Sequence, residues 1–420
     1  MELKRVVVTG LGALTPLGNN VADTWQALVN GVSGAGPITR FDATKFKTQI
    51  ACEVKDFDPM LYFSDRKEVR KCDLYAQYAI ACAGEALQHS KLDLENENKD
   101  RIGVIFSSGI GGILTFQEEV RSYDEERGPR INPFFIPKII ADIAAGHISM
   151  KYGFRGPNFA VVSACASSTN AIGDAFNYIR LGKADVIVSG GAEAPISIVG
   201  TGGFNAMNAL STRNDSPQTA SRPFSASRDG FVSGEGGVCL ILEELEHALA
   251  RNATIYAEVA GFGMSADAYH LTASHPEGVG AILVMKNALE DAEMKPESID
   301  YINVHGTSTP VGDISEVKAI KEVFGDHAYK LNISSSKSMT GHMLGATGAM
   351  EALICVLSTY NDIVPPTINH TEGDDDPEID YQLNFTFNKA QKRVINAAIS
   401  NTFGFGGHNA SVIVKKFSHK

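Results

Sequence analysis

The sequence predicts an α/β protein in which buried strands alternate with helices. Short apolar runs that end in glycine recur along the chain, and stretches with helical periodicity lie between them. Apolar runs of four or five residues are typical of parallel strands buried on both faces, and their alternation with helices is typical of an α/β sheet. The clearest runs are 6–9, 102–106 and 185–188, which lead into Gly10, Gly109 and Gly190.

A weak internal repeat predicts a two-part organisation. The segment 5–12 (RVVVTGLG) is loosely similar to the segment 256–263 (YAEVAGFG). A length of 420 residues fits two to four domains, or two domains that share one large core, at about 100–200 residues a domain. We therefore expect a duplicated fold with an N-terminal half at 1–252 and a C-terminal half at 253–420.

Charge and hydropathy argue against several classes of protein. Lysine and arginine number 37 against 49 acidic residues, and a net charge of −12 is poorly suited to broad contact with a nucleic-acid backbone. No run of about 18 apolar residues predicts a membrane span. Residues 1–8 lack the apolar stretch of a signal peptide and fit a strand. We expect a cytoplasmic protein without nucleic-acid or membrane partners.

Common functional motifs are absent or broken. The six cysteines form no C-x-x-C pair, which argues against a disulfide framework and a structural zinc site. Gly10-x-Gly12 follows a predicted strand, but Thr15 stands where a dinucleotide fingerprint needs its third glycine. Neither a Walker A loop nor a G-x-S-x-G elbow occurs. The chemistry must therefore be sought elsewhere in the chain.

Two segments have a clear helical period. The first follows Cys165 and should end at Gly182, and the second follows His342. Gly345 and Gly348 would let the second helix approach another backbone closely, at some cost in helix propensity. The apolar faces are Ile172, Ala175, Phe176 and Ile179 in the first helix, and Ala346, Ala349, Met350, Leu353 and Leu357 in the second.

Cys165 is a candidate nucleophile because of its position between a strand and a helix. The segment 159–169 reads as a strand, a tight turn of small residues and the start of the first helix. The helix N-terminus favours thiolate over thiol by up to ~2 kcal/mol, somewhat over one pKa unit. Most free cysteines are inert and buried, so this position alone leaves both interpretations open.

Two histidines and a lysine also follow apolar strands. His305 ends the run 301–304, and Lys337 and His342 lie in the loop after the run 331–334. Ligands gather at the carboxyl ends of strands in α/β sheets, so these groups can converge with Cys165. A lone histidine at a strand end is more often structural, but two histidines and a suitably placed cysteine are a much rarer coincidence.

The motifs around these residues resemble the β-ketoacyl-acyl carrier protein synthases. These are the decarboxylating condensing enzymes of the thiolase superfamily, and the resemblance is greatest to the elongating type II enzymes of bacterial fatty-acid synthesis. It covers essentially the whole chain and implies a thiolase-like fold, two similar halves in five α-β-α-β-α layers. The matching blocks surround Cys165, 305–309 (HGTST), 337–342 (KSMTGH) and 401–407 (NTFGFGG).

The resemblance implies condensation of an acyl thioester with a malonyl thioester, both held on acyl carrier protein. Cys165 is the implied nucleophile, with the backbone N–H groups of Cys165 and Phe403 as oxyanion donors. His305 and His342 would donate to the thioester oxygen when loss of carbon dioxide leaves an enolate. Lys337 would influence the protonation of the histidines. No cofactor is implied, because the 4′-phosphopantetheine arm arrives on the carrier protein.

Further positions carry implied roles in the same family. Glu316 matches the acid that would neutralise Lys337, although such a residue in isolation is more often an ordinary surface charge. Phe403 also matches a gating aromatic in a glycine-hinged loop. Ile110 matches a residue that lines the acyl pocket, Thr307 and Thr309 match residues that hydrogen-bond pantetheine, and Asn303, Glu351 and Ser400 match a monovalent-cation site, which would be structural.

A basic cluster at 65–71 is the expected landing site for the acidic carrier protein. Lys67, Arg70 and Lys71 match docking positions of the family, although a solvated helix face accounts for most such clusters. Asn208 stands where some relatives place another carrier-binding arginine, so docking can be weaker or differently distributed. The resemblance also implies a homodimer whose acyl pockets abut the interface near Phe135.

Three alternatives stay open at this point. The first is a ketosynthase of a specialised polyketide or aryl-polyene pathway, which acyl-chain preference would distinguish. The second is a non-catalytic chain-length partner, which the presence of Cys165 disfavours. The third is a degradative thiolase, which needs a second catalytic cysteine; no other cysteine lies in a matching glycine-rich C-terminal motif.

Overall fold

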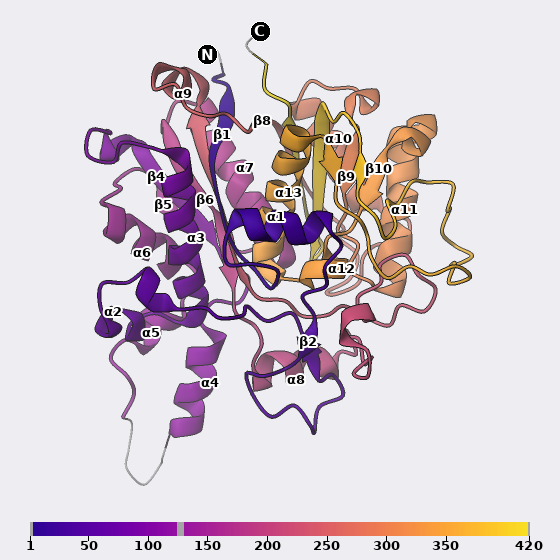
Figure 1. Ribbon diagram of the computed structural model, residues 1–420, viewed down its shortest axis with the longest axis horizontal. Coiled ribbons are helices and arrows are strands. Elements are labelled where there is room, and N and C mark those ends of the chain that lie inside the picture. The colour runs from indigo at the N-terminus through magenta and orange to yellow at the C-terminus, as the bar shows by residue number, and fades with distance from the viewer. Residues whose placement is uncertain (1–2, 124–129, 419–420) are drawn as a thin grey trace.

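The computed structural model describes residues 3–123 and 130–418. A ten-stranded sheet runs through the molecule in the order β10-β9-β13-β14-β8-β1-β7-β6-β4-β5 (Figure 1). Its strands are β1 (Val6–Leu14), β4 (Ile102–Ser107), β5 (Asn158–Phe159), β6 (Val186–Glu193), β7 (Gly236–Glu244), β8 (Ala257–Ala266), β9 (Tyr301–Asn303), β10 (Asn332–Ser334), β13 (Ala397–Gly404) and β14 (His408–Lys415). Two short pairs lie apart from it, β2 (Gly36–Pro37) with β3 (Ile50–Ala51) and β11 (Ile363–Val364) with β12 (Gln391–Lys392).

The sheet is mixed, so the expectation of parallel strands is confirmed for the runs at 102–106 and 185–188 and is wrong for the run at 6–9. β4 is parallel to β5 and β6, and β9 is parallel to β10 and β13. The pairs β1–β7, β6–β7, β13–β14, β14–β8 and β1–β8 are antiparallel. A strand buried on both faces is a continuous apolar run whatever the direction of its neighbour, so the sequence pattern could not distinguish the two.

The strand order repeats about the β1–β8 pair. On one side the order outward is β1-β7-β6-β4-β5, and on the other side it is β8-β14-β13-β9-β10. Each series begins with a long strand and ends with the strand that precedes a buried helix of the central layer. The position 252/253, where we expect the halves to meet, lies between α9 (Leu245–Ala250) and β8.

Helices cover this sheet in the layers expected from the resemblance. α7 (Ser167–Arg180) and α13 (Thr347–Asn361) contact each other and strands of both half-sheets, so they form the central layer (Figure 1). α3 (Leu74–Ser90) and α6 (Ile143–Tyr152) cover the N-terminal half-sheet, and α10 (Val279–Asp291), with α11 (Pro310–Phe324) beside it, covers the C-terminal one. The five-layer thiolase-like architecture is confirmed, with the two half-sheets joined through β1 and β8.

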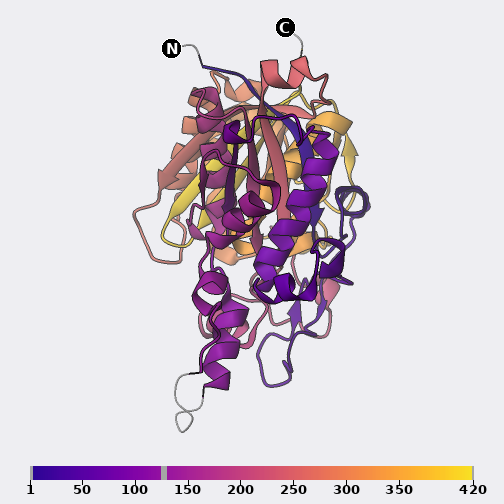
Figure 2. The ribbon, with the colours of Figure 1, turned by 90° about the vertical axis from the view of Figure 1, so that its left-hand side faces the viewer.

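The remaining helices are short or lie at the periphery. α4 and α5 project from the body below the N-terminal half-sheet (Figures 1 and 2). No helix in the described parts of the chain is long and apolar enough to cross a membrane. These helices are α1 (Val21–Val29), α2 (Arg66–Arg70), α4 (Ile113–Ser122), α5 (Phe135–Ile139), α8 (Ile198–Ala206) and α12 (Lys337–Thr340).

The two central helices form as their periodicity predicts. The apolar faces predicted for both are buried, and α7 is followed by Gly182 with a φ of +71°. Gly348 is required where α13 meets α7, because a Cβ there would lie 2.7 Å from the backbone nitrogen of Thr169. This close approach holds the beginnings of α7 and α13 together, and both helices begin at the candidate site.

Candidate active site

Cys165 lies in a sharp turn at the start of α7. The pairing of β5 ends at Phe159, so the predicted strand is shorter than expected, and the chain passes through Ala164 at a φ of +50°. This left-handed conformation costs a non-glycine residue of order 1–2 kcal/mol. The turn Ala164–Ala166 leads directly into α7, which confirms the predicted position of Cys165 at the helix N-terminus. All six cysteines are buried and free of disulfides.

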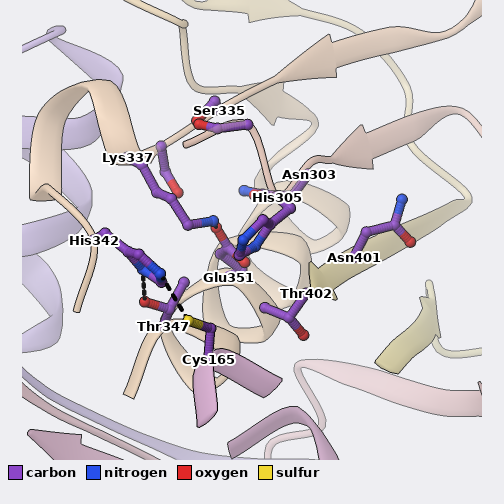
Figure 3. Close-up of polar contacts among 12 residues, drawn as sticks. Cys165, Asn303, His305, Ser335, Lys337, His342, Thr347, Glu351, Asn401 and Thr402 are labelled. Carbon is purple, nitrogen blue, oxygen red and sulfur yellow. Dashed lines mark hydrogen bonds and ion pairs between the residues drawn. The ribbon is translucent and has the colours of Figure 1, made fainter. Parts of the chain in front are cut away.

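His342 contacts the thiol of Cys165 directly. Its Nε2 lies 3.0 Å from Cys165 Sγ, and its Nδ1 lies 2.9 Å from Thr347 Oγ1 (Figure 3). All three side chains are buried. A neutral imidazole carries one proton. With Nδ1–H donating to Thr347 Oγ1, Nε2 is free to accept the thiol proton; with the Thr347 hydroxyl donating to Nδ1, Nε2 carries the proton toward the cleft.

His305 lies beside this pair on the loop after β9. The centroids of the His305 and His342 rings are 5.5 Å apart, and the rings are nearly perpendicular. Burial lowers the pKa of both histidines well below the usual value, and the nearby Lys337 cation lowers it further. Both imidazoles are therefore neutral near pH 7, so each can carry one N–H toward a substrate oxygen.

Lys337 and Glu351 form a buried ion pair behind the histidines. Lys337 Nζ donates to Glu351 Oε1, and neither side chain is exposed by more than 2% (Figure 3). Our expectation that Glu316 pairs with Lys337 is therefore wrong. The partner is Glu351, because it projects from the second turn of the buried helix α13 toward α12, which begins at Lys337.

Glu316 instead holds the His305 loop. Its two carboxylate oxygens accept the backbone N–H groups of His305 and Gly306, each at 2.9 Å. Glu316 is buried, which excludes an ordinary surface charge, and burial raises its pKa to about 7 despite these two donors. It acts on the site by fixing the backbone that carries His305.

The thiol of Cys165 is not ionised by its position alone. Burial raises the pKa of Cys165 to about 12, whereas the Lys337 cation and the backbone N–H groups of Phe405 and Cys165 act to lower it. Our expectation that the helix N-terminus favours the thiolate is not met, because desolvation outweighs the dipole. The thiol proton must therefore be taken up by a neighbouring group, and His342 is within hydrogen-bonding distance.

Phe405, and not Phe403, directs its backbone N–H toward the Cys165 thiol, so the expected placement of Phe403 is wrong. Phe403 lies within β13, opposite Asn409 of β14, and its ring centroid is 5.5 Å from that of His305. β13 ends at Gly404, which frees the backbone N–H of Phe405 to face the Cys165 thiol. Phe405 also lines the cleft, which makes it the aromatic of the glycine-rich loop that faces substrate.

A cleft of about 560 Å³ opens onto Cys165, His305 and His342. Ile110 lines one part of it, as the resemblance implies. Thr307 and Thr309 line another part, with their hydroxyls 2.9 Å apart. The two hydroxyls suit a flexible chain with polar amides.

The predicted docking residues and cation ligands lie outside the cleft. The carrier-docking residues, at the start and end of α2, are exposed; Asn208 lies at the cleft itself, where Lys47 Nζ donates to its Oδ1 at 3.1 Å. The predicted cation ligands lie beneath the histidines, with Asn303 opposite Ser400 in the β9–β13 register. The docking residues are Lys67, Arg70 and Lys71.

This fold and its cysteine–histidine site are those of an acyl-transferring enzyme. The family model of the beta-ketoacyl synthase N-terminal domain matches residues 3–248, and that of the C-terminal domain matches residues 256–371. The chain belongs to the beta-ketoacyl synthase family.

Relatives with high similarity cover the full length of the chain. Proteins named 3-oxoacyl-[acyl-carrier-protein] synthase 2 are 51% identical in Coxiella burnetii and 49% identical in Staphylococcus aureus, with 99% of each chain covered. Among solved structures, a beta-ketoacyl synthase from Burkholderia phymatum superposes with a TM-score of 0.89 at 35% identity, covering 99% of this chain and all of that one. A ketosynthase in complex with its type II polyketide acyl-carrier protein superposes equally well at 33% identity, with the same coverage.

Sequence reasoning missed Phe405, Thr347 and the pairing of Glu351. A second phenylalanine in the 401–407 motif was visible, but choosing between the two requires knowing where β13 ends. Glu351 is the single charged residue of a strongly apolar helix, and that isolation was a signal for a buried partner.

Proposed function

We propose that this protein is an elongating 3-oxoacyl-[acyl-carrier-protein] synthase of fatty-acid synthesis. The observation that carries the proposal is the 3.0 Å contact between Cys165 Sγ and His342 Nε2, in a cleft that also holds His305. The full-length similarity to proteins named 3-oxoacyl-[acyl-carrier-protein] synthase 2 supports the choice of the elongating type.

The first half-reaction transfers an acyl group to Cys165. Cys165 Sγ attacks the acyl-carrier thioester while its proton passes to Nε2 of His342, whose own proton lies on Nδ1. Nε2 then gives that proton to the carrier's sulfur, which leaves as a thiol. The backbone N–H groups of Cys165 and Phe405 face the developing oxyanion, and each such donor is typically worth about 3 kcal/mol.

The second half-reaction forms the carbon–carbon bond. The malonyl thioester loses carbon dioxide, and the electron pair of the broken bond forms an enolate on the thioester. His305 and His342 donate N–H groups to the enolate oxygen, so no carbon-bound proton has to be removed. The enolate carbon attacks the acyl-Cys165 carbonyl, and the sulfur leaves as a thiolate that is then protonated. Neutral histidines suit this role, because each keeps a donor N–H.

The proposal includes docking of acyl carrier protein on α2. Lys67, Arg70 and Lys71 are exposed, and none of the three forms an ion pair with a described residue, so all are available to an acidic partner. The pantetheine arm would then enter the cleft past Thr307 and Thr309. Lys47 at Asn208 offers a cation where some relatives carry an arginine.

The proposal also includes a homodimer formed through the α4–α5 region. Large apolar side chains are exposed there, and Phe135 stacks on Phe116 with ring centroids 6.3 Å apart. A face of this kind on a soluble enzyme is typical of a subunit interface. The exposed side chains are Phe116, Val120, Phe134, Ile136 and Ile140.

A structural monovalent cation fits the residues that the resemblance implies. Asn303 Oδ1, Glu351 Oε2 and Ser400 Oγ are buried oxygens that have no hydrogen-bond partner among the described residues. Buried oxygens without donors are costly, and a cation bound by all three would satisfy them. The ion would hold β9, β13 and α13 together beneath the histidines without taking part in the reaction.

The intact mass of the protein tests the proposed reaction. We expect one acyl adduct after mixing with a medium-chain acyl-carrier thioester, none in Cys165→Ala, and an unchanged adduct in the matched control Cys82→Ala. Addition of malonyl-carrier thioester should discharge the adduct as a 3-oxoacyl carrier two carbons longer.

Other outcomes would favour other functions. An adduct that malonyl carrier fails to discharge contradicts elongation and points to another extender unit or partner. A strong preference for polyketide or polyene intermediates would favour a specialised ketosynthase. Absence of any adduct would favour a non-catalytic chain-length partner, and acylation from coenzyme A thioesters alone would favour a thiolase.

A further inference from the structure

Glu193 is a buried carboxylate outside the catalytic set that binds backbone from both halves of the molecule. It ends β6 and is fully buried. Its Oε1 accepts from Ser108 Oγ at 2.6 Å and from the Ile110 N–H at 3.1 Å. Its Oε2 accepts from the Gly109 N–H at 2.7 Å and the Gly345 N–H at 2.9 Å. Four donors therefore converge on two oxygens.

The Gly345 donor belongs to a second sharp turn that matches the one carrying Cys165. Leu344 has a φ of +46°, as Ala164 has a φ of +50°, and each turn leads into a helix of the central layer. Gly345 therefore stands in the C-terminal half where Cys165 stands in the N-terminal half. This second turn has no nucleophile, and its N–H is directed to Glu193 instead.

The absence of a side chain at Gly345 is required by close packing. A Cβ there would lie 2.6 Å from Glu193 Oε2 and 2.9 Å from the Cα of Gly109. The second turn and the Ser108–Ile110 loop are thus in direct contact, with the Glu193 carboxylate bonded to both.

Each of these two segments contributes an apolar wall to the cleft. Ile110 lines it from the loop after β4, and Leu344 lines it from the second turn, with Cys165 between the two halves. Because Glu193 bonds to both segments, it fixes the distance between these walls. An acyl chain on Cys165 has to fit between them.

We propose that Glu193 is a positioning residue that sets the spacing of Ile110 and Leu344, and thereby the length of acyl chain that the cleft accepts. The inference rests on the proposed acylation of Cys165. A two-carbon acyl group extends little beyond the sulfur, whereas a long chain must pass Ile110, so only long chains depend on this spacing.

The substitution Glu193→Gln tests this role selectively. An amide has one acceptor oxygen, and that oxygen can replace Oε2 and keep the bonds to Gly109 and Gly345. The NH₂ group then faces Ser108, whose hydroxyl can accept, and the Ile110 N–H, which loses its acceptor. The variant therefore releases Ile110 while the second turn stays bound.

The measurement compares three rates in the full-length protein: acylation by an acetyl carrier, acylation by a long-chain acyl carrier, and decarboxylation of malonyl carrier by the unacylated enzyme. In Glu193→Gln we expect the long-chain to acetyl ratio to fall on the order of tenfold, as expected for loss of one bond to a charged acceptor, and decarboxylation to change less than twofold. Ser108→Ala removes another donor to Oε1 and should shift the ratio in the same direction by a smaller factor. The control Glu85→Gln, whose carboxylate accepts the Ala13 and Val21 N–H groups, should leave the ratio unchanged.

An unchanged ratio in Glu193→Gln overturns the inference, and so does a parallel fall of all three rates, which indicates a general scaffold role. If Glu193→Gln does not fold, the long-chain to acetyl ratio is measured in Ser108→Ala instead, and the same two results overturn the inference. If the wild-type protein forms no acyl adduct at all, the proposed function fails, and this inference fails with it. The missing adduct distinguishes that outcome from failure of the inference alone.

Discussion

Cys165 Sγ and His342 Nε2 lie 3.0 Å apart although 177 residues separate them in the chain. Each lies just before the start of one central helix: Cys165 in the turn before α7, and His342 in the loop before α13. The close packing of these helices at Gly348 and Thr169 therefore determines the catalytic distance.

His342→Ala should lower the rate of condensation by at least about 100-fold, because it removes both the partner of the thiol and a donor to the enolate. Thr347→Ala keeps the imidazole and loses only its Nδ1 partner, so its rate should fall about tenfold. Steady-state kinetics with circular dichroism as the folding check would measure both. Equal effects of the two substitutions would contradict the assigned roles.

Glu351→Gln should destabilise the protein by about 3–5 kcal/mol, because it leaves the buried Lys337 cation without its counter-charge. Urea denaturation gives the free energy of unfolding. The double variant Lys337→Met/Glu351→Leu should recover much of the loss, since no unpaired charge is then buried. A single variant as stable as the wild type would show that the pair is not buried as described.

His247 should make stability depend on pH. Its Nδ1 lies 2.6 Å from Glu243 Oε1 and its Nε2 lies 3.1 Å from Glu97 Oε2, and the bond to Glu243 raises the pKa of His247. Because the pKa of His247 is higher in the folded state than in the unfolded state, protonation of His247 stabilises the fold. This stabilisation is fully present below the unfolded-state pKa of about 6.5 and is lost as pH rises through the folded-state pKa. The stability difference between wild type and His247→Gln should therefore be largest below about pH 6.5 and shrink above it. Denaturation midpoints across this range measure it, and a difference independent of pH would refute the prediction.

Charge reversal on α2 should weaken carrier docking without changing the chemistry. In Lys67→Glu/Arg70→Glu we expect the KM for acyl-carrier substrates to rise about tenfold with kcat little changed, and added salt to narrow the difference. Lys286→Glu/Lys295→Glu is a matched control, because it also reverses two exposed positive charges, one on α10 and one just after it, on the other side of the molecule (Figure 1). A KM that rises equally in the control would mean that net charge, not the α2 site, guides the carrier.

The proposed cation should appear as a dependence of thermal stability on the salt. Melting temperature should be higher in potassium or sodium chloride than in tetramethylammonium chloride at equal ionic strength, because an ion that binds only the folded state raises the free energy of unfolding. Ser400→Ala removes one ligand and should reduce that difference. Identical melting curves in the three salts would rule out the site.

Local pattern predicted the elements that carry the chemistry. The small-residue turn before an amphipathic helix placed Cys165 correctly, and the ends of two apolar strands placed His305 and the 337–342 segment at the same edge of the sheet. These features depend on neighbours in sequence, so periodicity and turn chemistry could identify them.

Which groups are in contact depends on the tertiary structure. The thiol pKa is raised because the site is desolvated by both halves at once, and no local dipole reveals that burial. Glu351 rather than Glu316 meets Lys337 because α13 passes behind α12, and Phe405 rather than Phe403 faces the thiol because β13 ends between them. Motifs and their family resemblance were enough to predict Cys165, the two histidines and the layered fold. The charge states and partners of these residues arise from contacts between segments that are distant in the chain, which no local pattern encodes.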